Sequence, residues 1–339
     1  MDRKSTLFIL AVFSLFVSAC GGSTATPTTS PADTATATQP ATPTSRTIDI
    51  SGFNLQNYPR VDGSTSAYPL QIMLACQILN VPCIWLEGDL FGITRSIIPD
   101  PEFEGSSDRV EKIYNIWHSG THGSYMNLIE GNSDIIIVAR PPSEDELQAA
   151  EQADLHLEFK PIALDAFVFV LNEENPLEDI ALDDIRNVYT GEITHWWQLG
   201  GSLDEIHTYQ RNRNSGSQEL MESLVMRGAP MIESPEMILE SMMGPINALS
   251  DDPLGIGYSV YFYAAFIYPH ERVKMIAVDS VHPTFENIAD RSYPLTTEVY
   301  AVIRGDAPQE SAARLLLAWL QTVEGQAAVA ESGYVPILQ

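Results

Sequence analysis

The sequence predicts an α/β protein, and three observations lead to that class. Apolar runs rich in β-branched residues occur at residues 134–138, 167–171 and 298–303, and such unbroken runs are typical of strands buried on both faces of a mostly parallel sheet. Stretches with helical spacing lie between and after these runs. With 339 residues, 45% hydrophobic and 19% charged, the chain has an ordinary globular composition and the length of about two domains.

The N-terminus predicts export. Two basic residues precede an apolar run at residues 7–17, which is shorter than the roughly twenty residues needed to span a bilayer. We therefore expect a lipoprotein signal peptide at residues 1–19, because small residues directly before Cys20 resemble the bacterial lipobox, in which that cysteine is lipidated. The alternative is an ordinary signal peptide cleaved near Ala19.

Residues 20–46 predict a tether that follows the lipidated Cys20. The stretch after this cysteine is built mainly of Thr, Ala, Pro, Ser and Gly, without aromatic or large aliphatic residues, so it cannot bury enough apolar surface to offset the entropy of ordering. The folded part should begin near Thr47. We expect the protein to be extracytoplasmic and lipid-anchored to the outer face of the bacterial cell membrane.

The charge of the chain excludes two classes of partner. It has 18 basic and 45 acidic residues, a formal net charge of −27. Nucleic acids and anionic membrane surfaces both require basic patches, so we expect neither as a partner of the folded part. A small anion is not excluded.

The other two cysteines allow two interpretations. Cys76 and Cys83 flank a predicted helix end, where Pro82 breaks the helix. A local disulfide suits an oxidising exterior; the alternative is a pair of buried free thiols. Neither arrangement indicates catalysis.

Several helices are predicted from local signals. Leu70 follows Pro69 at the start of one, and a capping box opens another; Ser234 and Pro235 should open a third, whose methionines fill core gaps. The corresponding segments are 69–79, 143–153 with its capping box at 143–146, 234–243 with Met237, Met242 and Met243, 309–321, and 324–331.

Three loops combine glycine with hydroxyl side chains before a helical pattern. They are residues 62–66, 119–124 and 215–217, the third preceded by Arg211. A helix N-terminus leaves backbone N–H groups without partners and carries partial positive charge, so it can bind an anion. Ser and Thr are also common helix caps, but three such loops and an arginine together favour a shared oxyanion site.

These loops resemble the phosphate-binding proteins (PstS-like) that serve bacterial phosphate ABC importers. The matching segments, in chain order, are 62–70, 120–124, 134–146, the Thr-Gly-x-Ile-x-x-Trp-like segment 189–196, 211–217, 256–258, 324–326 and 333–336. The resemblance therefore spans about residues 61–337.

The resemblance implies a two-lobed type II periplasmic-binding-protein fold, with two mixed, mostly parallel sheets, flanking helices and two hinge crossovers. Lobe I should comprise residues 47–164 and 296–339, and lobe II residues 165–295. The implied ligand is inorganic phosphate, the partner is the permease of a phosphate ABC importer, and no cofactor is expected. We expect a monomer. The implied phosphate-binding residues are Thr65, Ser66, Thr121, Arg140, Arg211, Ser215, Gly216 and Ser217.

The sequence departs from the family at two acidic positions. An Asp that accepts a ligand proton in well-known members is Arg140 here, although a family branch with Ser-Arg exists, and a second Asp is replaced by Arg213. If both face the cleft, discrimination against sulfate is less secure, so another tetrahedral oxyanion is an alternative ligand. Otherwise both arginines point to solvent or pair with acids. Residues 87–113 are an insertion of open function.

Two other classes of function compete with a solute-binding role. An enzyme has no positive support, because the hydrolase elbow, metalloprotease and phosphate-loop motifs are missing from the sequence. Metal binding by His118 and His122 is disfavoured, since Gly120 lies between them. A surface signalling or adhesion module on the same fold would be expected to disrupt the Arg211 loop, which is intact.

Overall fold

The computed structural model describes residues 50, 52–88 and 95–337. The predicted signal peptide, the lipidation of Cys20 and the tether lie outside these residues. Among the described helices, none is both long and apolar enough to span a membrane.

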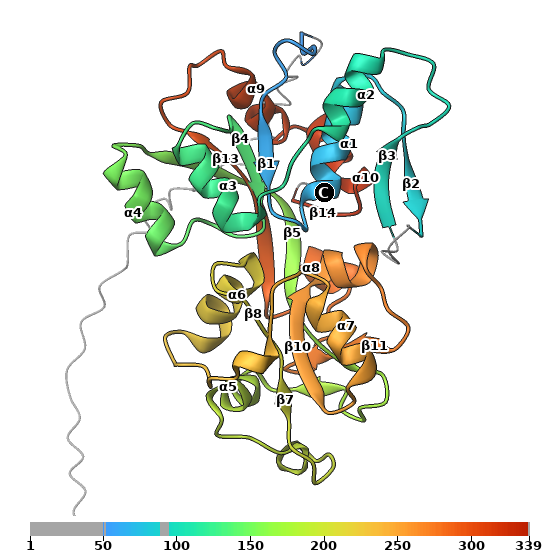
Figure 1. The fold of residues 1–339 in the computed structure, drawn as a ribbon, viewed down its shortest axis with the longest axis vertical. Helices are drawn as coiled ribbons and strands as arrows, with labels where there is room; N and C mark the ends of the chain where they lie inside the picture. The colour runs from blue at the N-terminus through green and yellow to red at the C-terminus, as the bar shows by residue number, and fades with distance from the viewer. Residues whose placement is uncertain (1–49, 51, 89–94, 338–339) are drawn as a thin grey trace, which may run out of the picture. The chain divides into compact units, whose positions relative to one another are not determined.

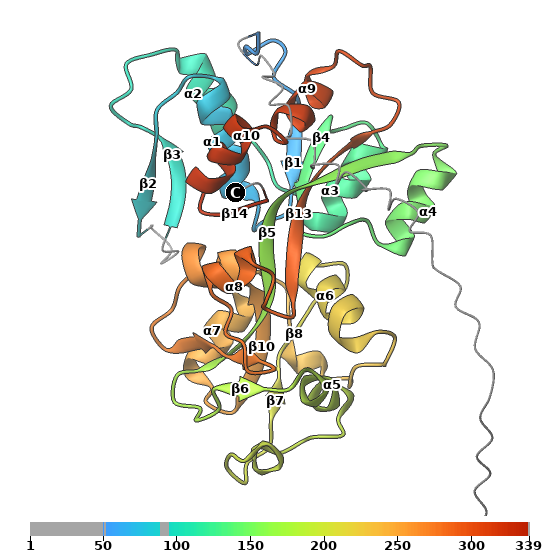
Figure 2. The same cartoon turned by 180° about the vertical axis from the view of Figure 1, so that it is seen from behind.

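Two long strands connect the two lobes. Strand β5 (Leu157–Asn172) and strand β13 (Thr296–Arg304) run side by side from one lobe to the other (Figures 1 and 2). Their antiparallel pairing ends at Ala166 and Thr296, and from Phe167 onward β5 pairs with a strand of the second lobe. The chain thus crosses between the lobes twice, while the predicted lobe limits stay a prediction.

The first lobe is a sheet with helices around it. Strand β4 pairs with β1 in parallel and with β13 in antiparallel, and all four of its residues are buried. The remaining elements are β1 (Val61–Gly63), α1 (Tyr68–Ile78), β2 (Cys83–Glu87), β3 (Arg95–Pro99), α2 (Ser107–Tyr114), α3 (Gly120–Ile129), β4 (Ile135–Val138), α4 (Glu144–Gln152), α9 (Ala312–Trp319), α10 (Val323–Glu331) and β14 (Val335–Pro336).

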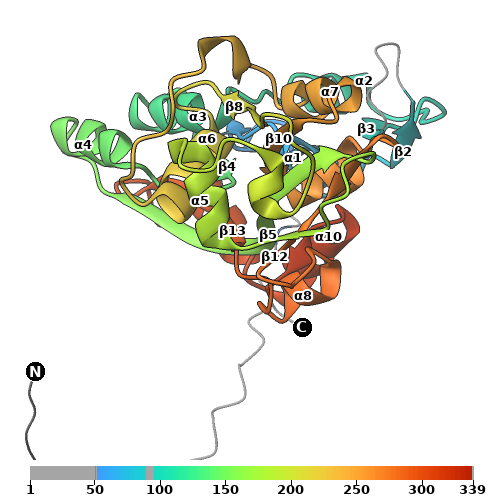
Figure 3. The same cartoon turned by 90° about the horizontal axis from the view of Figure 1, so that it is seen from below.

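The second lobe repeats this plan on the other half of β5. Helices α7 and α8 both pack against β5 and lie on opposite sides of it when the molecule is viewed from below (Figure 3). The elements are β6 (Asp179–Ile180), α5 (Leu182–Thr190), η1 (Trp196–Leu199), β7 (His207–Thr208), β8 (Gln210–Arg211), α6 (Gly216–Leu220), η2 (Met221–Met226), η3 (Pro235–Met237), β9 (Ile238–Leu239), α7 (Gly244–Asp251), β10 (Gly255–Val260), η4 (Tyr263–Ile267), β11 (Val273–Met275), β12 (Ala277–Val278) and α8 (Phe285–Ala289).

The α/β class and the two-lobed fold are confirmed, but the expectation of mostly parallel pairing is wrong for the main sheet. Strand β5 is antiparallel to β10, β11, β13 and β14. The reason is that β5 and β13 enter the second lobe and return from it, so they run in opposite directions. An unbroken apolar run indicates that a strand is buried on both faces, but it does not determine whether the strand pairs in parallel or in antiparallel with its neighbours.

The helix predictions are mixed. The capping box at Ser143 and Glu146 is confirmed, with the Glu146 carboxylate accepting the Ser143 N–H at 2.9 Å. The predicted helix opened by Ser234 and Pro235 is wrong, because only the single turn η3 forms there before strand β9. The adjacent helix begins at Gly244 instead, which leaves the intervening methionines in a loop.

The insertion forms part of a hairpin and a helix. Strands β2 and β3 pair in antiparallel, and a disulfide joins Cys83, at the start of β2, to Cys76 on α1. The hairpin contacts the second lobe, where the ring of Trp85 meets Phe266 edge-on at 5.1 Å and the Arg95 guanidinium lies 4.8 Å from the centre of the same ring. No described residue of the insertion lines the cleft between the lobes.

Candidate functional site

The three predicted loops meet in a cavity of about 460 Å³ between the lobes. The first loop, residues 62–66 after β1, is called loop one, and the second, residues 119–124 at the start of α3, loop two. The cavity receives residues from both and from the third loop, which precedes α6. Seven of the eight predicted ligand residues line it: Thr65, Ser66, Thr121, Arg211, Ser215, Gly216 and Ser217. Segments that are far apart in the chain therefore present their hydroxyl groups to one space.

The turn of loop one leaves two of its backbone N–H groups available to the cavity. The Ser64 N–H donates to the Ile137 carbonyl at 3.0 Å, and the next bonded amides are those of Ala67 and Tyr68. The N–H groups of Thr65 and Ser66 have no acceptor among the described residues. Because α1 begins directly after them, these amides are donors at a helix N-terminus, which suits an anion.

A buried carboxylate joins loop one to loop two. Asp62 Oδ1 accepts the Gly63 N–H at 2.7 Å and the Ser119 N–H at 2.8 Å, while its Oδ2 accepts from Asn127 at 2.8 Å. Asp62 therefore fixes the start of α3 against the end of β1. Sequence reasoning quoted Asp62 only as part of a motif and missed this role.

Gly216 and Thr121 approach each other closely across the cleft. A Cβ placed on Gly216 would lie 2.5 Å from Thr121 Oγ1, which is below any normal contact distance. Only glycine lets α6 come this close to α3. On the other side of the contact, Gly120 has a φ of +76°, a left-handed conformation that glycine adopts without strain.

Arg211 is the central cation of the site. Its residue is only 7% exposed, and no carboxylate among the described residues forms an ion pair with it. Its Nε donates to the Leu239 carbonyl at 2.9 Å, its Nη2 to the Glu240 carbonyl at 3.0 Å, and its Nη1 to Ser217 Oγ at 3.1 Å. Backbone and hydroxyl groups thus orient the guanidinium without neutralising it.

Burial lowers the pKa of Arg211 from its ordinary value, because the charged form loses hydration. Arginine nevertheless remains protonated in proteins. A buried positive charge that lacks a negative partner is costly unless an anion is supplied. The cleft is therefore an anion site by its electrostatics, although the whole chain is strongly acidic.

Arg140 corrects the prediction that it binds the ligand directly. It is 4% exposed, does not line the cavity, and pairs bidentately with Glu146 at 2.8 Å for each contact. Burial opposes its charge, but the hydrogen bonds and charge of Glu146 outweigh this and raise the pKa of Arg140. The side chain turns toward the start of α4, so it holds that helix and adds no free charge to the cleft.

Arg213, the second departure, is exposed and does not line the cavity. Met242 and Met243 were predicted to fill core gaps; both are partly buried against the core. They also line the cleft, where Met242 Sδ lies 3.5 Å from Arg211 Nη1. No local sequence signal identified them, because strand β9 pairs with β8 and brings this loop beside Arg211.

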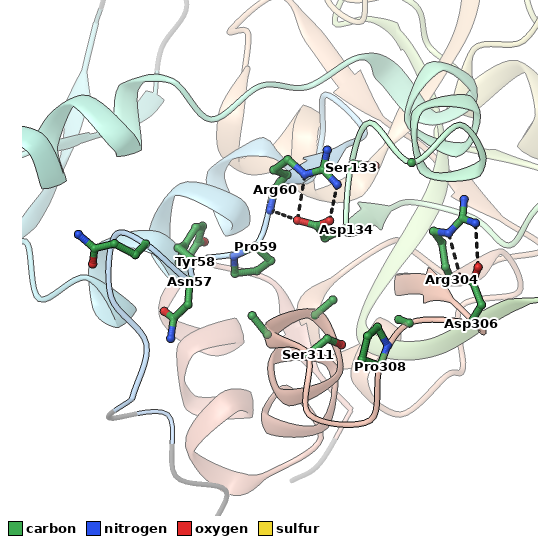
Figure 4. A pocket seen from close by; sticks show the side chains of 15 residues that line it. Asn57, Tyr58, Pro59, Arg60, Ser133, Asp134, Arg304, Asp306, Pro308 and Ser311 are labelled. Atoms are coloured by element: carbon green, nitrogen blue, oxygen red, sulfur yellow. Dashed lines mark hydrogen bonds and ion pairs between the residues drawn. The ribbon is translucent and has the colours of Figure 1, made fainter.

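A second cavity, of about 570 Å³, lies in the first lobe at the start of β1 and of α9 (Figure 4). Figure 4 shows that its charges are already paired, Arg60 with Asp134 and Arg304 with Asp306. Although it is larger, this cavity offers no uncompensated charge to a ligand. We therefore place the functional site in the cleft.

Among the described residues, no group of three or more potential metal ligands occurs. His118 and His122 both line the cleft, but they have separate partners. His122 Nδ1 lies 3.0 Å from Glu146 Oε1, and His118 Nδ1 lies 3.4 Å from Thr65 Oγ1.

A family model described as a PBP superfamily domain matches residues 108–324. The chain belongs to the PBP superfamily. This PBP superfamily chain is 26% identical over 178 residues to the phosphate-binding protein PstS of Bacillus subtilis, a match that covers 52% of the chain and 56% of that protein. It is 20% identical over 261 residues to PstS of Staphylococcus aureus, covering 74% and 77% of the two chains.

Solved structures of other PBP proteins share the fold. One is a putative phosphate ABC transporter substrate-binding protein with bound phosphate from Clostridium perfringens, at 23% identity and a TM-score of 0.57, covering 81% of this chain and 98% of that one. Another is an ABC-type phosphate transport receptor from Vibrio cholerae, at 20% identity and a TM-score of 0.56, with the same coverage. These likenesses show the fold.

Proposed function

We propose that the protein is an extracytoplasmic solute-binding protein that captures inorganic phosphate between its lobes and delivers it to the permease of an ABC importer. The observation that carries this proposal is the buried guanidinium of Arg211, which has hydroxyl and backbone partners but no carboxylate partner in the described part of the chain. A tetrahedral oxyanion supplies the missing negative charge and accepts from donors on both lobes.

In a two-lobed protein, ligand binding shifts the balance between open and closed conformations. Each lobe holds only part of the donor set: Thr65, Ser66 and Thr121 on one side, Arg211, Ser215 and Ser217 on the other. A ligand that bonds to both sets favours the closed state over the open one, by the difference in its affinity for the two. This coupling is what a permease requires in order to distinguish loaded from empty protein.

The proposal is tested by equilibrium dialysis of the full chain against labelled phosphate, with and without excess sulfate. We expect saturable phosphate binding that survives the sulfate. Absence of phosphate binding contradicts the proposal. If sulfate displaces phosphate equally well, the ligand is tetrahedral oxyanions in general and not phosphate in particular. A signalling or adhesion module that had lost its ligand is excluded by saturable binding of either anion.

Lipid anchoring through Cys20 is a further part of the proposal, and it rests on the small residues that precede this cysteine after an apolar run. One thioether-linked diacylglycerol provides the two or more acyl chains that stable anchoring needs. Labelling of bacterial cells with a fatty-acid probe should mark the wild-type protein and leave Cys20→Ala unmarked. Equal labelling of both removes this part of the proposal.

A further inference from the structure

The cleft contains many hydrogen-bond donors and few dedicated acceptors. Among the described residues that line it, Glu240 is the single acidic one. Glu240 is exposed, and its contact with Arg211 is made by the backbone carbonyl. Hydrogen phosphate carries at least one proton near neutral pH and sulfate carries none, so an acceptor in the cleft decides between them. Arg140, which stands where the resembling family has an Asp, does not line the cavity.

His118 is a candidate for this acceptor by position. It lines the cavity on the first lobe, and its Nδ1 lies 3.4 Å from Thr65 Oγ1. Two aromatic rings lie near it: its centre is 4.8 Å from that of Tyr68 and 6.5 Å from that of Trp117. These contacts fix the imidazole beside one of the proposed phosphate-binding hydroxyls.

The groups that face His118 set its charge. The carboxylate of Asp62 in β1 accepts from the N–H of the next residue, Ser119, the tilted ring of Tyr68 contacts the imidazole from α1, and the cationic Arg211 lines the same cavity from the second lobe. Burial lowers the pKa of His118, and the carboxylate of Asp62 opposes this only in part. The ring is thus neutral near pH 7, with one nitrogen as donor and the other as acceptor.

We infer that His118 is the specificity-determining residue of the cleft, because its imidazole accepts a hydrogen bond from the protonated oxygen of hydrogen phosphate that sulfate cannot donate. This inference rests on the proposed function. In the tautomer that serves this role, Nδ1–H donates to Thr65 Oγ1 and the lone pair of Nε2 is left for the ligand. No proton is transferred; the ligand keeps its proton and shares it in the hydrogen bond.

Sulfate meets this acceptor with an oxygen that has no proton. Sulfate therefore binds only when His118 takes a proton from solvent and becomes a donor, a requirement that disfavours sulfate by about 10- to 100-fold near neutral pH. Sulfate binding thus takes up protons, and sulfate affinity rises as the pH falls.

The test is calorimetric titration of the full chain with phosphate and with sulfate, in wild type, His118→Gln and His118→Asn, at pH 6 and pH 8. A glutamine amide can rotate to donate, so the phosphate-to-sulfate ratio should fall at least about 10-fold in His118→Gln. The asparagine variant does not reach the ligand and should also lose discrimination. His207→Gln, whose ring pairs with Asp252 outside the cleft, is the control and should keep the ratio.

Proton uptake provides a readout that a purely structural role would not change. Sulfate titrations of the wild type, in buffers of different ionisation enthalpy, should show proton uptake that disappears in both His118 variants. If the wild type binds phosphate while folded His118 variants keep both the ratio and the proton uptake, the inference is overturned and the proposed function stands. If the wild type does not bind phosphate, both the inference about His118 and the proposed function are overturned.

Discussion

The proposed closure of the cleft requires the close approach of Gly216 to Thr121, and a methyl group added at Gly216 tests this requirement. The added Cβ would lie 2.5 Å from Thr121 Oγ1, whereas Thr121 Cβ is 3.4 Å away, an ordinary contact distance. The hydroxyl oxygen is therefore the whole obstacle. Overpacking of this kind costs about 1–3 kcal/mol, which corresponds to an affinity for phosphate about 5- to 150-fold weaker in Gly216→Ala.

In the open state that the proposed function implies, Gly216 and Thr121 are apart, so the ligand-free variant should keep the thermal midpoint of the wild type. Thr121→Ala alone should weaken binding by roughly 2- to 10-fold, because one hydroxyl donor is lost. In the double variant the obstacle is gone, so it should bind phosphate more tightly than Gly216→Ala alone. Calorimetry on the four proteins measures this coupling. If Gly216→Ala keeps wild-type affinity, or if the two changes simply add, the reasoning is refuted.

Two further predictions concern stability. Burial raises the pKa of Asp165 to about 7, although the N–H groups of Phe262 and Ala166 oppose the shift. The contribution of this carboxyl group to folding stability is therefore full below its unfolded pKa of about 3.9, and it is lost as the pH rises through 7. Asp165→Asn should therefore gain stability relative to the wild type between pH 5 and pH 8 in urea unfolding; an unchanged pH slope would contradict this. Trp85→Ala, which removes the ring against Phe266, should lower the unfolding free energy by about 1–2 kcal/mol and the midpoint by about 3–6 °C. Leu86→Ala, 40% exposed on the same strand, is the control, and an equal loss in both variants would remove the role of the hairpin contact.

The sequence predicted the loops of the site better than it predicted the sheet around them. Thr65, Thr121, Arg211 and Ser217 occur in short motifs whose local chemistry, hydroxyl groups and amides at helix starts, is visible without tertiary information. Strand direction was not visible, because the apolar run of β5 has the same appearance in parallel and antiparallel pairings.

The positions of the Arg140 and Met242 side chains could not be predicted from local sequence signals. Arg140 follows a buried strand, and whether its side chain enters the cleft depends on Glu146, which receives it within hydrogen-bond distance at the start of α4. Met242 reaches Arg211 only because β9 pairs with β8. Both placements depend on side-chain direction and long-range pairing, for which the sequence offered no periodic signal.

The claim that the cleft binds phosphate through an uncompensated guanidinium is tested most directly at Arg211. Titration of phosphate into the full chain should give saturable binding in the wild type and a loss of at least about 100-fold in Arg211→Met, because the variant removes the charge and two or more charge-assisted hydrogen bonds. Arg211→Lys should recover only part of the affinity, since an ammonium cannot reproduce the planar fork. Wild-type phosphate affinity in a folded Arg211→Met protein would contradict the account.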